Sequence, residues 1–232
     1  MKRSQVNRAI HEAHELFTRL GFPLPEWASW SPEHWQGVGP EADEIRKHGL
    51  GWMVTDFGSG DFEHCGLTIF VVSSGLWVPG GPTVGQPYAE KYFMVLPGQV
   101  TPDHFHIEKD ETLKVLKGGR LEVELSWPTP DGRSLSSDDV NVTVDSISRK
   151  IPAGGLITLE PGQRVHFPRR LAHLFRGRQG DGKVFAGELS TPNDDKTDNI
   201  FPGRDVTSKP IVEDEPPAFV LLNEYSPARQ LI

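Results

Sequence analysis

Residues 98–118, GQVTPDHFHIEKDETLKVLKG, decide the fold, because they set two histidines and a glutamate between flanking glycines. On a strand, His104 and His106 leave the same face, since side chains two residues apart point the same way. Glu111 lies five residues later, where the next strand is expected to begin after a short turn, and can return to that face. Two imidazoles and one carboxylate suit a divalent first-row metal such as Mn, Fe, Co, Ni or Zn.

A second segment, residues 162–173 (GQRVHFPRRLAH), is expected to bring in a third histidine. A strand, a turn marked by Pro168 and a second strand would point His173 inward. Together with the first three residues it would leave two positions of an octahedral ion open for substrate oxygens or waters. His166 is the competing fourth ligand, but it precedes the turn and is expected to pack or to hydrogen-bond instead. A lone His-x-His arises often by chance, whereas the two spaced patterns together do not.

The regions around these motifs predict short strands after an N-terminal helical segment. In residues 1–50 an apolar stripe with spacings of three and four predicts a helix capped by Ser4, and Ser31-Pro32-Glu33 starts a second. From residue 51 the period changes to two, and ten to twelve short strands follow, the last at 219–223. We therefore expect one domain over 1–232: a helical cap, then an antiparallel β-barrel or jelly roll with a polar loop at about 192–217.

The amino-acid composition argues against several classes of protein. The 232 residues include 24 Lys and Arg against 32 Asp and Glu, a formal charge of −8, which argues against a nucleic-acid partner. The single cysteine, Cys65, cannot form an internal disulfide. No apolar run suggests a secretion signal or a membrane span, so a cytoplasmic protein without a membrane partner is expected.

The two motifs resemble those of the cupin superfamily of metal-binding β-barrels. The first motif matches at every position, whereas Arg170 and Gly177 stand in the second where cupins usually have glycine and asparagine. Cupin membership by itself specifies no reaction.

A closer resemblance, covering nearly the whole chain, is to the D-lyxose isomerase family. Besides the metal motif it rests on residues 1–7 (MKRSQVN), 88–93 (YAEKYF), 188–199 (ELSTPNDDKTDN) and 213–217 (EDEPP). The resemblance implies a homodimer that interconverts D-lyxose with D-xylulose and D-mannose with D-fructose. It also implies one divalent ion per chain, typically Mn²⁺ with Co²⁺, Zn²⁺, Fe²⁺ or Ni²⁺ as alternatives. Its ligands would be His104, His106, Glu111 and His173.

Aldose–ketose isomerisation moves hydrogen between C1 and C2, through a metal-bound cis-enediol or a hydride shift, and a proton route needs a base. Strand alternation turns Lys91 and Phe93 into the barrel, where a lysine must be paired or must contact substrate. Glu213, in the late acidic loop, is the first candidate for the proton shuttle. Glu188 is the second, because strand alternation places it on a face of small residues that is typical of a barrel lining. The structural alternatives are a Lys91–Glu111 ion pair and a solvated acidic turn.

Sugar hydroxyls are expected to meet Lys91, Asp194 and Asp198, and Asp195 and Asn199 of the same run could also bind them; equally, Asx residues cap turns. Phe93 is expected to form part of an apolar wall. Two other classes of function compete with the isomerase. One is a cupin dioxygenase or, with Arg164, Arg169 and Arg170 at the mouth, a phosphosugar isomerase. The other is a sugar- or metal-binding module without turnover, which would have no need of an inward lysine and spare carboxylates.

Overall fold

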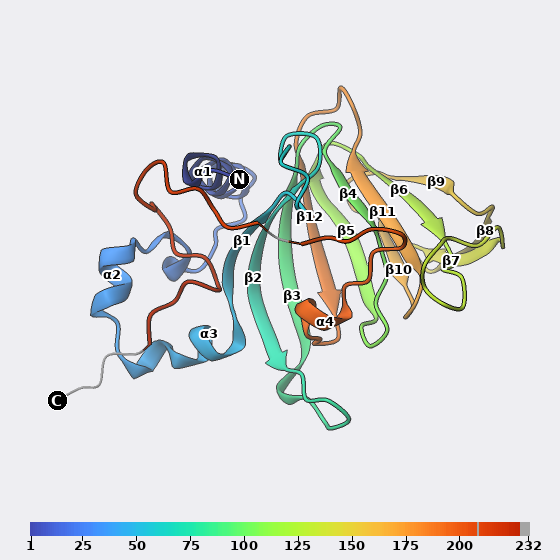
Figure 1. Cartoon of the computed structure of the whole chain (residues 1–232). Helices are drawn as coiled ribbons and strands as arrows, with labels where there is room; N and C mark the ends of the chain where they lie inside the picture. The colour runs from blue at the N-terminus through green and yellow to red at the C-terminus, as the bar shows by residue number, and fades with distance from the viewer. Residues whose placement is uncertain (208, 228–232) are drawn as a thin grey trace.

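The computed structural model describes residues 1–207 and 209–227, and its strands form two antiparallel sheets (Figure 1). The larger sheet has the order β1 (Gly51–Thr55), β2 (Leu67–Leu76), β3 (Val84–Val95), β12 (Val184–Ser190), β5 (Glu111–Gly118), β10 (Arg164–Phe167), β7 (Val140–Val144) and β8 (Ile147–Ile151). The smaller sheet has the order β4 (Val100–His104), β11 (Ala172–Gly177), β6 (Leu121–Ser126) and β9 (Gly155–Leu159).

The two sheets share one apolar core. Leu113 and Val115 alternate inward from β5, and Val123 and Leu125 do so from β6. This two-residue period confirms the predicted jelly roll. The barrel is not closed, because among the described strands the ladders stay within two separate sheets. Two sheets packed face to face already bury both inner faces, so closure is not needed to build the core.

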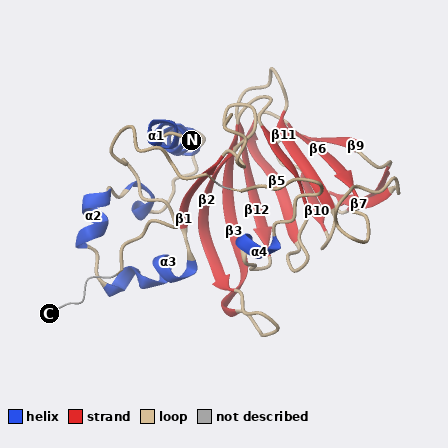
Figure 2. Ribbon diagram, in the orientation of Figure 1, coloured by secondary structure: helices blue, strands red, loops and turns tan. Residues whose placement is uncertain are grey.

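The predicted apolar stripe of helix α1 (Arg3–Arg19) packs on the outer face of the larger sheet. Figure 2 shows the helix beside β1. Phe17 packs on Phe185 of β12 with ring centroids 4.4 Å apart. The expected cap, Ser4, lies inside the helix, which begins after Lys2. The reason is tertiary: the Ser4 hydroxyl donates to the carboxylate of Asp214 at 2.7 Å instead of capping its own helix.

The remaining N-terminal elements are short: η1 (Glu26–Ser29), α2 (Pro32–Gly37), η2 (Pro40–Ala42) and α3 (Asp43–His48). Ser31 caps α2 as predicted, its hydroxyl accepting from the backbone N–H of His34 at 3.2 Å. Gly49 ends α3 in the left-handed conformation at φ 60°, which glycine adopts without a Cβ clash. No helix in the described part of the chain is both long and apolar enough to cross a bilayer.

Two strand predictions need correction. Strand β8 was not foreseen because it is an exposed edge strand whose residues do not alternate in polarity. It forms because Asp145 and Ser146, at φ 50° and 66°, make the tight turn that folds it back on β7. The strand expected at 219–223 is only an isolated bridge between Leu221 and Trp52, with no ladder to extend it.

The expected polar loop follows β12, and its path brings residues to the site. It forms the short helix α4 (Asp195–Asp198) and then returns towards α1 (orange to red in Figure 1). There the backbone N–H of Arg3 donates to the carbonyl of Val212 at 2.9 Å. The loop thus connects the inner face of the sandwich with its helical end.

Arg170, which replaces the usual cupin glycine, is exposed and has a φ of 68°. A side chain in this left-handed region costs about 1–2 kcal/mol, partly offset by the greater unfolded-state entropy of glycine. We therefore expect Arg170→Gly to raise the free energy of unfolding by about 0.5–1 kcal/mol. Urea unfolding of both proteins measures the difference; an unchanged or lower midpoint would contradict the strain.

Candidate metal centre and cavity

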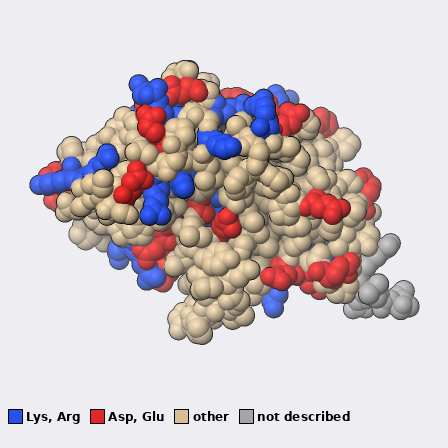
Figure 3. Space-filling view, turned by 180° about the vertical axis from the view of Figure 1, so that it is seen from behind, with Lys and Arg blue, Asp and Glu red and all other residues tan. Residues whose placement is uncertain are grey.

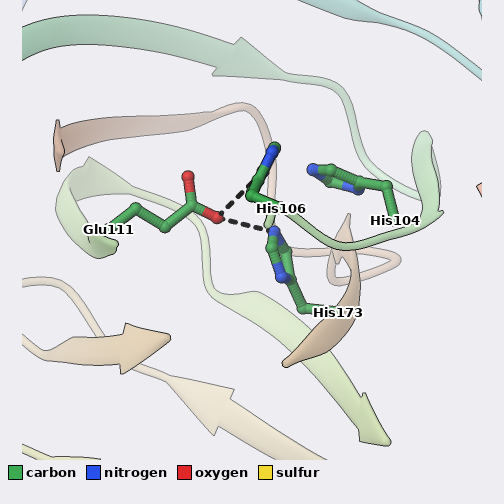
Figure 4. Close-up of side chains that lie close together, drawn as sticks. All are labelled: His104, His106, Glu111 and His173. Carbon is green, nitrogen blue, oxygen red and sulfur yellow. Dashed lines mark ion pairs between the residues drawn. The ribbon is translucent and has the colours of Figure 1, made fainter. Parts of the chain in front are cut away.

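Four side chains converge where the two sheets meet (Figure 4). His104 ends β4, His106 lies two residues beyond, and His173 on β11 is the cross-strand partner of His104. Glu111 begins β5 and enters from the larger sheet. One potential ligand atom from each of the four lies within 4.8 Å of all the others, and all four residues are buried. The sequence prediction that these residues share one point in space agrees with this geometry.

Backbone carbonyls orient all three imidazoles. The Nδ1 atoms of His104, His106 and His173 lie 2.8, 2.9 and 3.0 Å from the carbonyl oxygens of Pro102, Asp198 and Leu171. A carbonyl only accepts, so each Nδ1 carries the hydrogen and each Nε2 keeps a free lone pair. This is the arrangement found around metal-binding histidines.

The imidazole nitrogens and the carboxylate oxygen that point into the centre are arranged to bind a cation. Within the described residues, the buried Nε2 of His106 has no hydrogen-bond partner. Glu111 Oε1 lies 2.8 Å from Nε2 of His173, so two lone pairs face each other unless a proton or a metal ion lies between. Burial, followed by the two neighbouring histidines, lowers the pKa of His104 well below its ordinary value and keeps it neutral. The donor set therefore fits a divalent ion of the first transition row.

Lys109 is a buried cation beside this set that the sequence analysis did not single out. Its Nζ lies 2.5 Å from Oε2 of Glu111 and 3.2 Å from Oε1 of Glu188. Burial alone would lower the pKa of Lys109, but Glu111, Glu188 and Asp195 raise it above its ordinary value. The available signal was its position two residues before Glu111, which strand alternation places on the same face.

The Glu111 carboxyl stays ionised in this setting. Burial would raise its pKa, but Lys109 and then the two histidines beside it hold the pKa of Glu111 well below its usual range. Its two oxygens are thereby divided: Oε2 faces the lysine and Oε1 faces the imidazoles. One interpretation of the sequence paired Glu111 with Lys91. In the structure the ion-pair partner of Glu111 is Lys109.

A second ion pair lies on the inner face of the larger sheet. Lys91 on β3 and Glu188 on β12 are direct cross-strand partners, with Nζ and Oε1 3.4 Å apart. Lys91 also lies 3.4 Å from Oδ2 of Asp195 in α4. Burial raises the pKa of Asp195, but Lys91 and Lys109 outweigh it, and the net shift is downward. The inward orientation of Lys91 and Glu188 agrees with the predicted alternation.

These charges line one cavity together with three of the four candidate ligands, His104, Glu111 and His173, and the cavity also has an aromatic wall. Phe93, as predicted, is on that wall, stacked on Phe175 with an interplanar angle of 8°. Phe201 closes another side and lies against His104, with ring centroids 5.7 Å apart. A sugar has apolar C–H faces and a polar edge, and this cavity offers both kinds of surface.

Three residues expected at the site lie elsewhere or have another task. Asp194 caps α4 by accepting from the N–H of Lys196, and it does not line the cavity. The Asp198 carboxylate is occupied by backbone N–H groups. Glu213 lies 2.7 Å from the guanidinium of the buried Arg3, beside α1, because the chain has by then left the cavity. Of the four Asx residues considered, Asp195 and Asn199 are the two that line the cavity wall.

The basic residues considered for a phosphate are also outside the cavity. Arg164, Arg169 and Arg170 do not line it, and Arg169 pairs with Asp110 at 3.1 Å. His166 is half-exposed and lies 3.9 Å from the same aspartate, away from the imidazole cluster. On the face of the molecule shown in Figure 3, acidic and basic side chains are interspersed.

The comparisons with known proteins agree with this geometry. A family model described as D-lyxose isomerase matches residues 1–225. D-lyxose/D-mannose isomerases of Serratia proteamaculans and Escherichia coli O157:H7 are each 39% identical, over 97% of this chain and 98% of their own. Among solved structures, L-ribose isomerase of Acinetobacter sp. DL28 with bound L-ribose shares the fold at 17% identity. Its TM-score is 0.55, over 83% of this chain and 82% of that one.

Proposed function

Because the chain belongs to the D-lyxose isomerase family, we propose that it interconverts D-lyxose with D-xylulose and D-mannose with D-fructose in this cavity. The observation that carries the proposal is a cavity in which two lysine–carboxylate pairs lie beside three members of the metal-ligand set, with the fourth member, His106, grouped next to them. A binding module has no use for buried groups that can exchange protons with its ligand, whereas an isomerase needs them.

His104, His106, Glu111 and His173 would hold the divalent ion. The ion, when bound, supplies a Lewis acid that polarises the sugar's carbonyl and the neighbouring hydroxyl oxygen. Glu111 contributes its charge to this set, and Lys109 keeps that carboxyl ionised. The imidazoles need no rearrangement, because their Nδ1–H groups are already committed to carbonyls.

Glu188 is the residue we assign to proton transfer at carbon. It is a cavity carboxylate outside the ligand set, and the ammonium groups of Lys91 and Lys109 both contact its Oε1. In the aldose-to-ketose direction it would take the proton from C2 and return it to C1. The hydroxyl proton must move from O2 to O1, and the Lys91 ammonium would hydrogen-bond to these oxygens. Phe93 would pack against the sugar's C–H face.

The charge of the cavity favours a neutral sugar over a phosphosugar. Two lysines face three carboxylates, Glu111, Glu188 and Asp195, and each lysine already has an anionic partner. A phosphate would need unpaired cations in the cavity, preferably the planar fork of an arginine. Paired lysines also distinguish the cavity from a dioxygenase site, where O₂ and an organic substrate would take the open positions of Fe(II).

Three further features belong to the same proposal. We propose Mn²⁺ as the resident ion, with Co²⁺, Zn²⁺, Fe²⁺ and Ni²⁺ as alternatives that the same donors can bind. We also propose a homodimer and a cytoplasmic location. The family resemblance supports the homodimer.

The function is tested by ketose formation from D-lyxose and D-mannose with EDTA-treated protein, before and after addition of Mn²⁺. We expect turnover only after the ion is restored, because the chain itself offers no equivalent Lewis acid. Mannose 6-phosphate serves as the comparison substrate and should react poorly, since each cavity lysine already has a carboxylate partner and neither is left unpaired for a phosphate. No turnover on either neutral sugar, with Mn²⁺ demonstrably bound, would contradict the proposal.

A further inference from the structure

Asp198 connects a segment that lines the cavity to the loop at residues 105–109, which carries the metal ligand His106. Its carboxylate is 4% exposed and accepts three consecutive backbone N–H groups. Oδ1 accepts from Ile107 at 2.8 Å and from Glu108 at 2.9 Å, and Oδ2 accepts from Lys109 at 3.1 Å. Consecutive N–H groups that converge in this way form an anion-binding concavity, here filled by the protein's own carboxylate.

The backbone of the same residue reaches the metal centre directly. The carbonyl oxygen of Asp198 accepts the Nδ1–H of His106 at 2.9 Å. Two residues on, Ile200 forms a reciprocal pair of hydrogen bonds with Phe105, both 3.0 Å long. Six hydrogen bonds therefore join residues 198–200 to residues 105–109, the loop that orients His106 and Lys109.

The other side of the segment faces the cavity. Asp195 pairs with Lys91, and Asn199 and Phe201 line the wall. This short segment therefore contributes three residues to the cavity wall and also hydrogen-bonds to the metal ligand His106. A displacement of this segment would disturb the ligand set and the wall together.

We propose that Asp198 is a positioning residue that couples docking of residues 194–201 over the cavity to occupancy of the metal centre. The inference rests on the metal centre of the proposed function. An ion on Nε2 of His106 makes its Nδ1–H a stronger donor to the Asp198 carbonyl, and that carbonyl in turn makes Nε2 a better ligand. Coupling of this kind is reciprocal: the docked segment tightens metal binding, and the bound metal tightens the docking.

The test substitutes Asp198→Asn. The amide keeps the size of the carboxylate but sets an N–H₂ group against backbone N–H donors, so at least one of the three bonds is lost. We expect the dissociation constant for Mn²⁺, measured by equilibrium dialysis, to rise about 10- to 100-fold, the range typical of groups that orient metal ligands. Asp194→Asn is the matched control, because it lies on the same segment, has no bond to residues 105–109, and asparagine caps helices as well as aspartate does.

Hydrogen exchange supplies the readout that a merely structural role would not change. In the wild type, Mn²⁺ should slow exchange of the Ile200 N–H, which is bonded to Phe105, and in Asp198→Asn this protection should be lost or much reduced. Unchanged Mn²⁺ affinity and protection in a folded Asp198→Asn variant would overturn the inference. If that variant fails to fold, the wild type decides: equal exchange with and without bound Mn²⁺ overturns the coupling. A wild type that binds no Mn²⁺ would instead contradict the metal centre itself.

Discussion

Replacement of His106 by alanine should leave the protein unable to retain its divalent ion. The substitution removes one of four donors and also breaks the bond between the imidazole and the Asp198 carbonyl. The loss of affinity should exceed the roughly 10- to 100-fold that removal of an orienting group costs, because a direct ligand is lost. Elemental analysis after gel filtration measures the bound metal, and sugar turnover should fall with it.

His166→Ala is the control for this experiment. His166 was the alternative fourth ligand, yet it is half-exposed beside Asp110, and its loss should leave the metal content unchanged. Full metal occupancy in His106→Ala, or metal loss in His166→Ala, would show that the ligand set has been assigned incorrectly.

Glu188→Gln should retain the metal and lose turnover. Glutamine has nearly the same shape and can still accept hydrogen bonds from Lys91 and Lys109, but it cannot take up a proton from carbon. Loss of a general base costs about 10²- to 10⁴-fold in kcat. Steady-state kinetics on D-lyxose, together with the metal content of the same sample, measures this effect.

Glu213→Gln separates the two carboxylates considered for this task. Because Glu213 contacts Arg3 and not the cavity, its substitution should lower stability slightly and leave kcat unchanged. A large loss of kcat in this variant, with normal turnover in Glu188→Gln, would reverse the assignment.

Incorporation of deuterium from solvent into the product distinguishes the enediol route from the hydride shift. A hydride shift incorporates no deuterium and needs no base.

The local sequence pattern was sufficient to predict the sheets and the candidate metal ligands. Strand alternation predicted the inner face of the sandwich, and the two spaced motifs predicted which four side chains share one point. Both predictions rest on the two-residue period of a strand, which any short segment reveals without its neighbours. The same period turned Lys91 and Glu188 inward, where the structure pairs them across β3 and β12. The exposed edge strand β8 was missed because its residues carry no such period.

The path of the chain between the strands was decided only by the tertiary structure. Glu213 and Asp198 are both acidic residues in one polar loop, and nothing local distinguishes them. Asp198 forms hydrogen bonds with residues 106–109, which lie 89 to 92 residues earlier in the sequence. Glu213 instead pairs with Arg3, 210 residues away. The reason is that a carboxylate takes whichever donors the folded chain brings to it, and in a loop no hydrogen-bond ladder fixes these donors in advance. The sequence by itself therefore determined the fold and the candidate ligands, and the folded chain determined which buried charges surround them.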